Sequence, residues 1–239
     1  MPHCIAVIPT YDEAPNLAVL LPRVLAQDPG LEVLIVDDDS PDGTGKLAAE
    51  WSQREPRVHV LHRPHKAGLG AAYRAGLAWA LERGAELIVQ MDADLSHPPE
   101  SLPAFFEAIQ SCDAVLGSRY LGGITVVNWP IERILLSYFG NAFVRRATGL
   151  ALRDLTGGFR MIRREALQRS GFAAIRSEGY SFQIELNYRL VRSGARIREL
   201  PFFFLDRTRG VSKLSWRIGF ETLWISLWLR VADALGRLD

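Results

Sequence analysis

Cysteine is scarce in this chain of 239 residues: Cys4 and Cys112 are the two, and they form no C-x-x-C pair. Cys4 lies in an apolar run and is expected to be a small buried side chain. Neither a disulfide framework nor a zinc site is therefore indicated. The first ten residues, MPHCIAVIPT, lack a basic stretch followed by a long apolar run, so we expect no signal peptide and a cytoplasmic location.

Long uncharged runs are missing as well. The longest one near the C-terminus, residues 222–229, is far shorter than the ~20 residues that span a bilayer. Internal repeats and low-complexity tracts are also absent from the sequence. With 48% hydrophobic and 23% charged residues, the composition is that of an ordinary globular α/β domain with a sizeable core.

Charge is close to balanced overall, at +1, but it is divided between the two halves of the chain. Up to Ser118 there are 8 Lys and Arg against 17 Asp and Glu, a net of −9; from Arg119 onward there are 20 against 10, a net of +10. This suggests an acidic half that recruits a metal ion and a basic half that faces phosphates or an anionic membrane. The alternative is that the arginines are only solvated surface residues.

Short apolar runs alternate with segments of helical periodicity through the first half of the chain. Since strands that alternate with helices form parallel sheets with right-handed crossovers, the pattern predicts a doubly wound, Rossmann-like, mostly parallel α/β sheet. Pro22 should kink or break the first helix. The predicted strands are 5–9, 31–36, 58–61, 86–90, 114–117 and 196–205; the predicted helices begin at 15, 44, 69 and about 102, then cover 130–146, 180–192 and 215–235, with 154–162 irregular or strand-like.

Three of these strands end in acidic residues: Asp12-Glu13, Asp37 to Asp39, and Asp92 with Asp94. The ends of parallel strands meet at the rim where open α/β sheets bind ligands. Asp92 and Asp94 in MDADLSHPP are spaced to share Mg²⁺ or Mn²⁺, which keeps positions open for substrate phosphates. A nucleotide with a metal-bridged diphosphate fits this pattern, although a chance grouping of loop acids would look the same.

Other motifs are incomplete. Gly43-Thr44-Gly45-Lys46 fails as a phosphate loop, which would need glycine at Ser40 and a hydroxyl at Leu47. Residues 68–70, Gly-Leu-Gly, are too short for a dinucleotide fingerprint and suggest a close approach at a helix start. An aspartate-dependent phosphatase would place its D-x-D at the first strand, not at a later one. His97 is either a metal ligand, a partner of one, or a structural residue.

Taken together, the motifs resemble those of dolichyl-phosphate mannose synthases, also called polyprenol monophosphomannose synthases, which are family 2 glycosyltransferases with the GT-A fold. The resemblance covers nearly all of the chain before the last helix. Asp12 departs from the asparagine usual in the family, and Ser181 stands where some members have a donor-binding lysine. The matching segments are PTYDE (9–13), VDDDSPDGT (36–44), GLGAAY (68–73), MDADLSHPP (91–99), GSRY (117–120), DLTGGFRM (154–161), GYSFQIE (179–185) and DRTRGVSK (206–213).

The resemblance implies a role for particular residues of this chain. The guanosine of GDP-mannose would be held by Pro9, Tyr11, Glu13, Val36 and Asp38. The diphosphate and the metal, Mg²⁺ or Mn²⁺, would be held by Asp92, Ala93 and Asp94, with Ser96 beside them. The donor and acceptor phosphates would be held by Arg119, Arg133, Arg207 and Lys213. Among these, Asp94, Arg119 and Arg133 are the expected catalytic residues.

The implied reaction is the inverting transfer of mannose from GDP-mannose to a polyprenyl or dolichyl phosphate. The expected organisation is a GT-A domain over residues 1–213, divided into a nucleotide-sugar half (1–118) and an acceptor half (119–213), followed by an amphipathic helix (214–239). Trp216, Trp224 and Trp228 suit a membrane interface, so we expect peripheral association with the cytoplasmic face of a membrane. The alternatives for this helix are that it only packs on the domain or that it docks on a separate membrane-anchoring subunit, and no nucleic-acid partner is expected. The rival activities are transfer of glucose from UDP-glucose and, in another class, a non-catalytic nucleotide-sugar-binding subunit.

Overall fold

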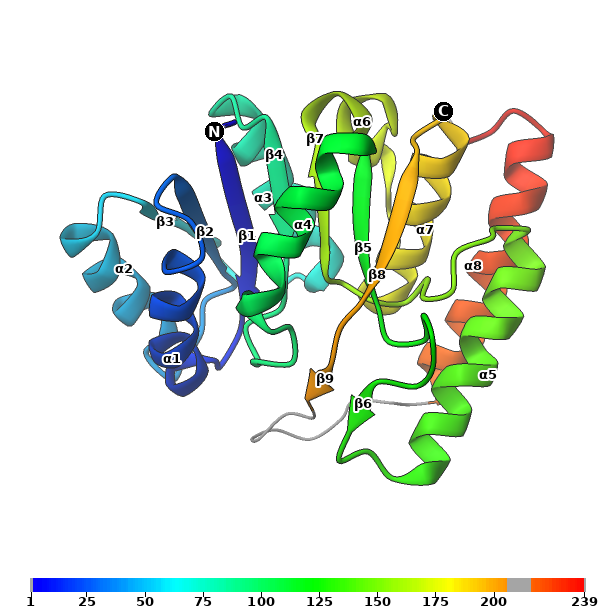
Figure 1. The fold of residues 1–239 in the computed structure, drawn as a ribbon, viewed down its shortest axis with the longest axis horizontal. Helices are drawn as coiled ribbons and strands as arrows, with labels where there is room; N and C mark the ends of the chain where they lie inside the picture. Colours follow the sequence, from blue (N-terminus) through cyan, green and yellow to red (C-terminus); the bar gives the residue numbers. More distant parts are fainter. Residues whose placement is uncertain (1, 206–215, 239) are drawn as a thin grey trace.

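The computed structural model describes residues 2–205 and 216–238, with the backbone alone for 216–220. Strands and helices alternate along the chain from the N-terminus to β5 (Figure 1). The strands are β1 (Cys4–Thr10), β2 (Leu31–Asp37), β3 (Val58–His62), β4 (Leu87–Gln90), β5 (Ala114–Ser118), β6 (Val126–Val127), β7 (Arg160–Arg163), β8 (Ile197–Pro201) and β9 (Phe204–Leu205). The helices are α1 (Ala14–Leu25), α2 (Thr44–Arg54), α3 (Leu69–Glu82), α4 (Leu102–Ala108), α5 (Ile131–Thr148), α6 (Arg164–Arg169), α7 (Gly179–Arg192) and α8 (Trp216–Ala234).

One sheet with the strand order β3-β2-β1-β4-β7-β5-β8 organises the domain. β1, β2, β3 and β4 pair in parallel, and so do β5 and β8, which confirms the predicted mostly parallel α/β sheet. β7 lies between β4 and β5 and is antiparallel to both. The sequence indicated only an irregular or strand-like segment there. A small parallel pair of β6 and β9 lies outside this sheet.

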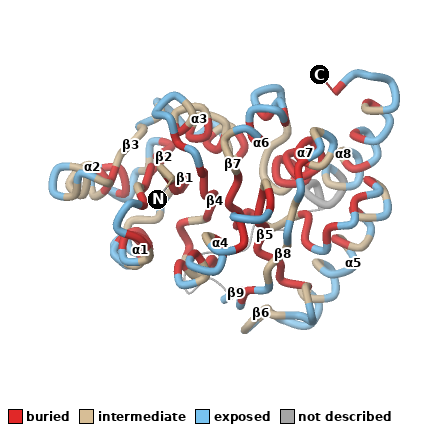
Figure 2. Tube along the Cα trace, turned by 45° about the horizontal axis from the view of Figure 1, so that its top comes forward, coloured by how far each residue is buried: buried red, intermediate tan, exposed pale blue. Residues whose placement is uncertain are grey.

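Buried apolar side chains fill both faces of the sheet, because its strands are covered by helices on either side (Figure 2). β1 is buried along its whole length, so its residues point alternately into the two cores. The buried stripe of α1, at Leu17, Leu20, Leu21 and Val24, has helical spacing. The expected break at Pro22 is wrong: α1 continues through this residue.

α5 and α8 lie side by side at one end of the sheet (Figures 1 and 2). α8 is packed on the domain, since Leu229 and Ala232 are buried and the Tyr188 hydroxyl of α7 donates to Asp233 at 2.9 Å. Both helices also present large apolar side chains to the outside. In the described part of the chain no helix combines the length and the apolar character that crossing a membrane requires.

Candidate active site

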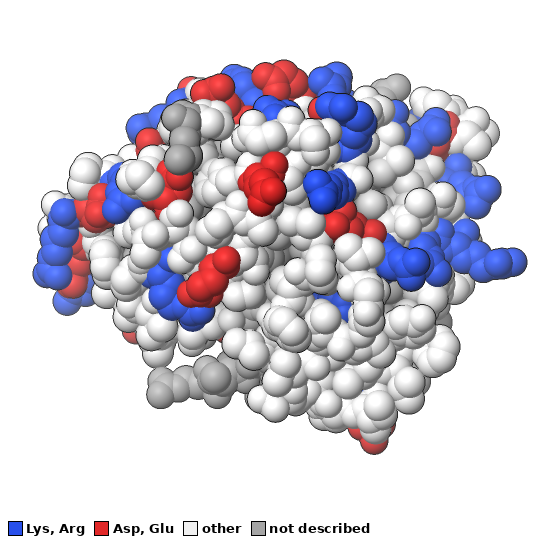
Figure 3. Space-filling view, viewed as in Figure 1, with Lys and Arg blue, Asp and Glu red and all other residues white. Residues whose placement is uncertain are grey.

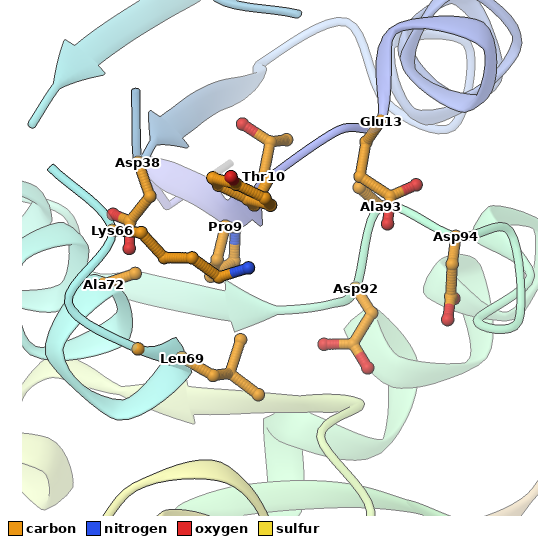
Figure 4. Close-up of a pocket in the computed structure, with 12 residues that line it drawn as sticks. Pro9, Thr10, Glu13, Asp38, Lys66, Leu69, Ala72, Asp92, Ala93 and Asp94 are labelled. Atoms are coloured by element: carbon orange, nitrogen blue, oxygen red, sulfur yellow. The ribbon is translucent and has the colours of Figure 1, made fainter. Parts of the chain in front are cut away.

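A cavity of about 310 Å³ opens at the carboxyl ends of β1, β2 and β4. Parallel strands bring these ends to one rim, as the acidic strand ends predicted. Figure 4 shows Asp38 on one side of the cavity, Asp92 and Asp94 on the other, and the Lys66 side chain reaching between them. The lining residues are Pro9, Thr10, Tyr11, Glu13, Asp38, Lys66, Gly68, Leu69, Ala72, Asp92, Ala93 and Asp94.

The Asp38 side of the cavity is built by the loop that follows β3. Oδ1 of Asp38 accepts a hydrogen bond from Arg63 at 2.7 Å, and its Oδ2 accepts one from the backbone N–H of Ala67 at 3.2 Å. Nζ of Lys66 lies 3.4 Å from the centre of the Tyr11 ring. This side therefore offers a fixed carboxylate, a cation and an aromatic ring, which suit a nucleobase with both donors and acceptors.

The loop from β3 reaches α3 through a close approach that glycine permits, as residues 68–70 suggested. A Cβ at Gly70 would lie 2.4 Å from the backbone oxygen of Ser177. The N–H of Gly70 donates to Oε2 of Glu178 at 2.7 Å. The start of α3 is thus held against the segment before α7, and this fixes the wall of the cavity at Gly68 and Leu69.

Asp92 and Asp94, on the opposite side, are held by their neighbours. The Tyr73 hydroxyl donates to Oδ1 of Asp92 at 2.9 Å, and the backbone N–H of Asp92 donates to Nδ1 of His97 at 2.9 Å. The backbone N–H of Ser96 donates to Oδ1 of Asp94 at 3.1 Å, and its hydroxyl donates to the same oxygen. Each carboxylate is therefore oriented before any ligand binds.

His97 is a positioning residue in this arrangement. Its ring is buried, stacks on Phe159 at 5.0 Å, and meets Phe202 and Phe204 edge-on. Burial lowers the pKa of His97, although the charges of Asp92 and Asp94 oppose this. A neutral ring whose Nδ1 accepts from Asp92 carries its proton on Nε2. Of the roles left open by the sequence, the structure supports that of a partner to Asp92.

The oxygen donors present fit a hard divalent cation. Asp92, Asp94 and the hydroxyl of Ser96 lie together, whereas the described residues hold no group of three or more His, Cys, Asp or Glu side chains that would make a protein-only site. Mg²⁺ is commonly held by one or two carboxylates and completes its shell with water and substrate phosphate. The donor set therefore fits a metal that binds together with a diphosphate.

Arg119 leaves β5 in a buried ion pair. Its Nε and Nη2 each donate to Asp154 at 2.7 Å, and Nη2 also donates to Thr156 at 2.8 Å. Burial alone would lower the pKa of Arg119, but the Asp154 carboxylate outweighs it and the pKa is raised. In the described residues Nη1 of Arg119 makes no hydrogen bond, so it keeps two donors for an anion.

Arg133, in the first turn of α5, stacks over Trp129 at 3.9 Å. The Arg119 guanidinium lies 5.9 Å from the centre of the same Trp129 ring, so the two guanidinium groups lie on the same side of the molecule. Arg119 also lies 5.4 Å from the ring of Phe204, which meets the His97 ring edge-on at 6.1 Å. This group of residues therefore adjoins the carboxylates of the cavity.

Arg160 is fully buried behind Asp92. Its guanidinium donates to Gln183 and Gly157 at 2.6 Å each and to Asn187 at 3.0 Å, with no carboxylate partner among the described residues. Burial lowers its pKa to about 10, which leaves it protonated near neutrality. A Cβ at Gly158 would lie 3.5 Å from Oδ1 of Asp92, so backbone fills the space between this network and the carboxylate.

The structure brings together most of the residues expected from the sequence. Of the expected guanosine and diphosphate contacts, all but one line the cavity; Val36 is fully buried in β2, in register with Pro9. Ser96 contacts Asp94 but lies outside the cavity lining, as do Arg119 and Arg133. Arg207 and Lys213 lie outside the described residues.

Several residues that build the site were not singled out from the sequence. Lys66 lies in a loop without a recognised motif. Tyr73, Asp154 and Arg160 lie in the matching segments GLGAAY and DLTGGFRM, but no role was inferred for them. A tyrosine at the buried position of an amphipathic helix, and an arginine within an irregular or strand-like segment, were the signals that a polar network lay beneath the site.

Comparison with known proteins agrees with this geometry. The signature of "Glycosyl transferase family 2" matches residues 5–171. A polyprenol monophosphomannose synthase of Mycolicibacterium smegmatis is 46% identical over 213 residues, which cover 88% of this chain and 80% of the relative. An undecaprenyl-phosphate mannosyltransferase of Micrococcus luteus is 46% identical over 211 residues, covering 88% and 87%.

Solved structures share the fold at lower identity. Glucosyl-3-phosphoglycerate synthase of Mycobacterium tuberculosis, in a complex with Mn²⁺, UDP and glucosyl-3-phosphoglycerate, has a TM-score of 0.67 and 18% identity and covers 96% of this chain and 80% of its own. A mannosyltransferase of Pyrobaculum calidifontis, in complex with GDP-mannose and Mn²⁺, has a TM-score of 0.60 and 20% identity, covering 99% and 72%.

Fold, cavity and sequence relatives thus define a nucleotide-sugar-dependent transferase of the GT-A class. The chain belongs to glycosyl transferase family 2.

Proposed function

We propose that this protein is an inverting glycosyltransferase that moves mannose from GDP-mannose to a polyprenyl phosphate and forms polyprenyl-phosphate β-mannose. The observation that carries the proposal is the cavity with Asp38 at one end and Asp92 and Asp94 at the other. The names of the two bacterial relatives at 46% identity support the substrate class.

The donor fits the cavity from base to diphosphate. Asp38, held by Arg63 and Ala67, accepts the N–H donors of guanine, and Tyr11 packs on the nucleoside. Pro9 and Glu13 border the same end, and Val36 supports it from the core. The diphosphate lies at the other end, beside Asp92, Ala93 and Asp94.

A divalent metal ion, Mg²⁺ or Mn²⁺, would be held by Asp92 and Asp94 with Ser96 beside them. When bound, it neutralises the charge that develops on the leaving diphosphate. Tyr73 and His97 hold Asp92 in place through its carboxylate and its backbone N–H. These contacts keep the ligand set ordered at little entropic cost when the donor binds.

The acceptor needs orientation rather than activation. A phosphate monoester has a second pKa of about 6 and is mostly dianionic at neutral pH, so no general base is required. An oxygen of the lipid phosphate attacks C1 of mannose as the bond from C1 to the GDP oxygen breaks, and GDP departs with that electron pair. Nη1 of Arg119, with Arg133, would hold the acceptor phosphate opposite the donor; Arg207 and Lys213 are assigned here from the family resemblance alone.

The lipid acceptor places the protein at a membrane. We assign it a peripheral position on the cytoplasmic face, supported by the exposed apolar side chains of α5 and α8 and the net charge of +10 from Arg119 onward. A separate membrane-anchoring subunit is the alternative. It predicts that vesicles alone fail to recruit the protein.

The test is a transfer assay. Purified protein is incubated with radiolabelled GDP-mannose, Mg²⁺ and a polyprenyl phosphate, and label in the organic phase shows mannosyl lipid. GDP-mannose should exceed UDP-glucose clearly in kcat/KM; equal rates would remove the mannose assignment and keep the class. An absence of transfer with both donors, from folded protein that still binds GDP-mannose, would favour the non-catalytic binding subunit.

A further inference from the structure

A second cavity, of about 410 Å³, lies between the loop after β5 and the middle of α5. It shares no lining residue with the nucleotide cavity. The Tyr120 side chain borders it and is held by a hydrogen bond to Ser137 at 2.6 Å. Its lining residues are Tyr120, Leu121, Gly122, Gly123, Ile124, Tyr138, Asn141, Ala142, Arg145 and Arg153.

The charge in this cavity is positive. Arg145 and Arg153 line it, and within the described residues neither guanidinium forms a hydrogen bond or an ion pair. The Glu199 carboxylate accepts hydrogen bonds from the backbone N–H groups of Arg153 and Asp154 at 2.8–3.0 Å, and not from the Arg153 guanidinium. Two guanidinium groups at the wall of one cavity, with their donors available, form a site for a phosphate group.

One side of the cavity is open backbone. Gly122 and Gly123 have φ angles of +78° and +143°, and a Cβ at either would meet no atom within 4 Å. The backbone can therefore come close to a bulky group without side chains in the way.

Apolar side chains adjoin the arginines. Ile124 and Tyr138 line the cavity and are exposed, and Leu135, Leu136 and Phe139 on the same helix are 47%, 61% and 63% exposed. Figure 3 shows Lys and Arg side chains gathered on the side of the molecule where α5 lies, above a broad surface almost free of charge. A phosphate site beside an exposed apolar surface matches the two parts of a phospholipid at a membrane surface.

We propose that this cavity binds the headgroup phosphate of an anionic phospholipid, and that it docks the protein on the bilayer at a point distinct from the acceptor phosphate site. The proposal rests on the proposed function, because an enzyme that takes a lipid phosphate must meet the headgroup layer. A soluble phosphate would use the arginines but not the exposed Ile124, Tyr138 and Phe139. A phospholipid in a bilayer uses the arginines and the apolar side chains, because its phosphodiester meets the arginines and its apolar part meets the exposed surface.

The test compares two pairs of arginines at the same end of the molecule. Arg145→Gln/Arg153→Gln removes the cavity pair, and Arg146→Gln/Arg230→Gln removes two exposed arginines that do not line it. Lys46→Gln/Arg54→Gln, on α2, is the control for net charge. Binding is measured by co-sedimentation with vesicles of phosphatidylglycerol and phosphatidylcholine, and with vesicles of phosphatidylcholine alone.

The cavity pair should weaken binding to phosphatidylglycerol vesicles about thirtyfold, or about 2 kcal/mol at 1.4 kcal/mol per tenfold. The Arg146/Arg230 pair and the α2 pair should each weaken it less than about threefold, since diffuse surface charge is screened by salt. Inorganic phosphate should not displace the protein beyond a chloride control of equal ionic strength. Equal losses from both arginine pairs at this end of the molecule, or displacement by inorganic phosphate, would overturn the proposal.

Transfer to a short, water-soluble polyprenyl phosphate separates this proposal from the proposed function. The cavity pair should keep its kcat/KM within about twofold of the wild type, because the acceptor phosphate is held elsewhere. A tenfold loss would make the cavity part of the acceptor site and overturn a separate lipid site. If the wild-type protein shows no transfer, the proposed function is wrong. If the wild type transfers mannose and the Arg145→Gln/Arg153→Gln variant binds vesicles as well as the wild type does, only the lipid site is wrong.

Discussion

The two halves of the molecule use apolar residues in opposite ways. In residues 1–118, for which we propose donor binding and which we call the donor half, apolar side chains fill the cores on both faces of the sheet and polar groups converge on the rim. In the rest of the chain, which joins the proposed acceptor half to the C-terminal helix and which we call the acceptor half from here on, α5 and α8 turn many of them outward. Of the sixteen large apolar side chains that are exposed in the described residues, only Val19 precedes Arg119.

This difference shows that a run of apolar residues in a helix of the acceptor half does not mean that all of those side chains are buried. α5 combines buried Val144 with exposed Leu136 and Phe139, and α8 combines buried Leu229 with exposed Trp224. Each helix is apolar around much of its circumference, so one side packs on the domain and the other is left for a second apolar environment. The two halves should therefore respond differently to loss of an aromatic ring.

Removal of one phenylalanine from each half tests this difference most directly. Phe105→Ala, in α4, removes a ring that is 1% exposed and lies 4.6 Å from that of Phe159, so it should lower the free energy of unfolding by about 3–5 kcal/mol. Phe139→Ala should change it by less than about 0.5 kcal/mol. Urea unfolding measures both, and a comparable loss from Phe139→Ala would mean that its exposed face belongs to the core.

The Arg119–Asp154 pair joins the end of β5 to the loop before β7. Arg119→Gln leaves the fully buried Asp154 without its partner, and breaking such a pair costs about 3–5 kcal/mol. Asp154→Asn in the same chain should recover stability without recovering transfer, because Nη1 is still missing. Arg189→Gln, which breaks the buried pair with Glu185 in α7, is the control. It should destabilise the fold and leave the KM values for GDP-mannose and for the polyprenyl phosphate unchanged. Recovery of transfer by the double variant would reduce Arg119 to a structural residue.

Asp94 tests the donor half. Asp94→Asn should lower turnover more than about a hundredfold while the melting temperature stays close to that of the wild type, because metal assistance is worth several kcal/mol in the transition state. Asp39→Asn is the matched control, since Asp39 is exposed on the same rim with φ of +60°, a conformation that asparagine accepts. Wild-type turnover in excess chelator would contradict the metal assignment.

Two tyrosine–aspartate hydrogen bonds, one in each half of the molecule, give a smaller and more selective contrast. Tyr73→Phe removes the hydroxyl that donates to Asp92, and Tyr188→Phe removes the one that donates to Asp233, both at 2.9 Å. Loss of a group that orients a metal ligand costs about tenfold or more in metal affinity. Tyr73→Phe should therefore raise the Mg²⁺ concentration at half-maximal turnover about tenfold, and Tyr188→Phe should not. Equal effects would show that the Tyr73 bond acts only on the fold.

Much of the donor half could be predicted from the sequence. Strict alternation of short apolar runs with helical segments, and acids at three strand ends, fixed the parallel sheet and the rim to within a few residues. The sequence left β7 open between an irregular and a strand-like segment, and its antiparallel direction was not predicted, because its four residues, Arg160–Arg163, begin and end in arginine and carry no clear strand period. The prediction of a break at Pro22 was wrong because packing of the buried α1 stripe outweighs the local cost of a proline within the helix.

Contacts between residues that are far apart in the chain could not be predicted from the sequence. Asp154 lies thirty-five residues along the chain from Arg119, and Glu178 lies a hundred and eight residues from Gly70. No local sequence pattern therefore predicts either contact. The same holds for Arg160, whose buried partners, Gln183 and Asn187, come from α7. Local periodicity indicates which face of an element is buried, but not which polar groups meet there.

His97 lies where the two halves meet, and its titration gives the smallest expected effect. The ring comes from the donor half, and Phe159, Phe202 and Phe204 enclose it from the other. Burial holds its pKa below the ordinary 6.5 in the folded protein, so the unfolded chain binds a proton first as the pH falls. The resulting stability is present above pH 6.5 and is lost as the pH falls from 6.5 toward the folded pKa.

His97→Asn removes the titration and keeps an oxygen acceptor for the N–H of Asp92. The measurement is urea unfolding of the wild type and of this variant at pH 7.5 and 5.5, because the difference between them cancels the carboxylates and the other histidines. The wild type should lose more stability than the variant, by at most about 1.4 kcal/mol at one pH unit below the unfolded pKa. Parallel pH profiles would show that His97 accepts a proton in the folded state as readily as in the unfolded chain. The aromatic enclosure would then be open to water, and the two halves would not close around this ring.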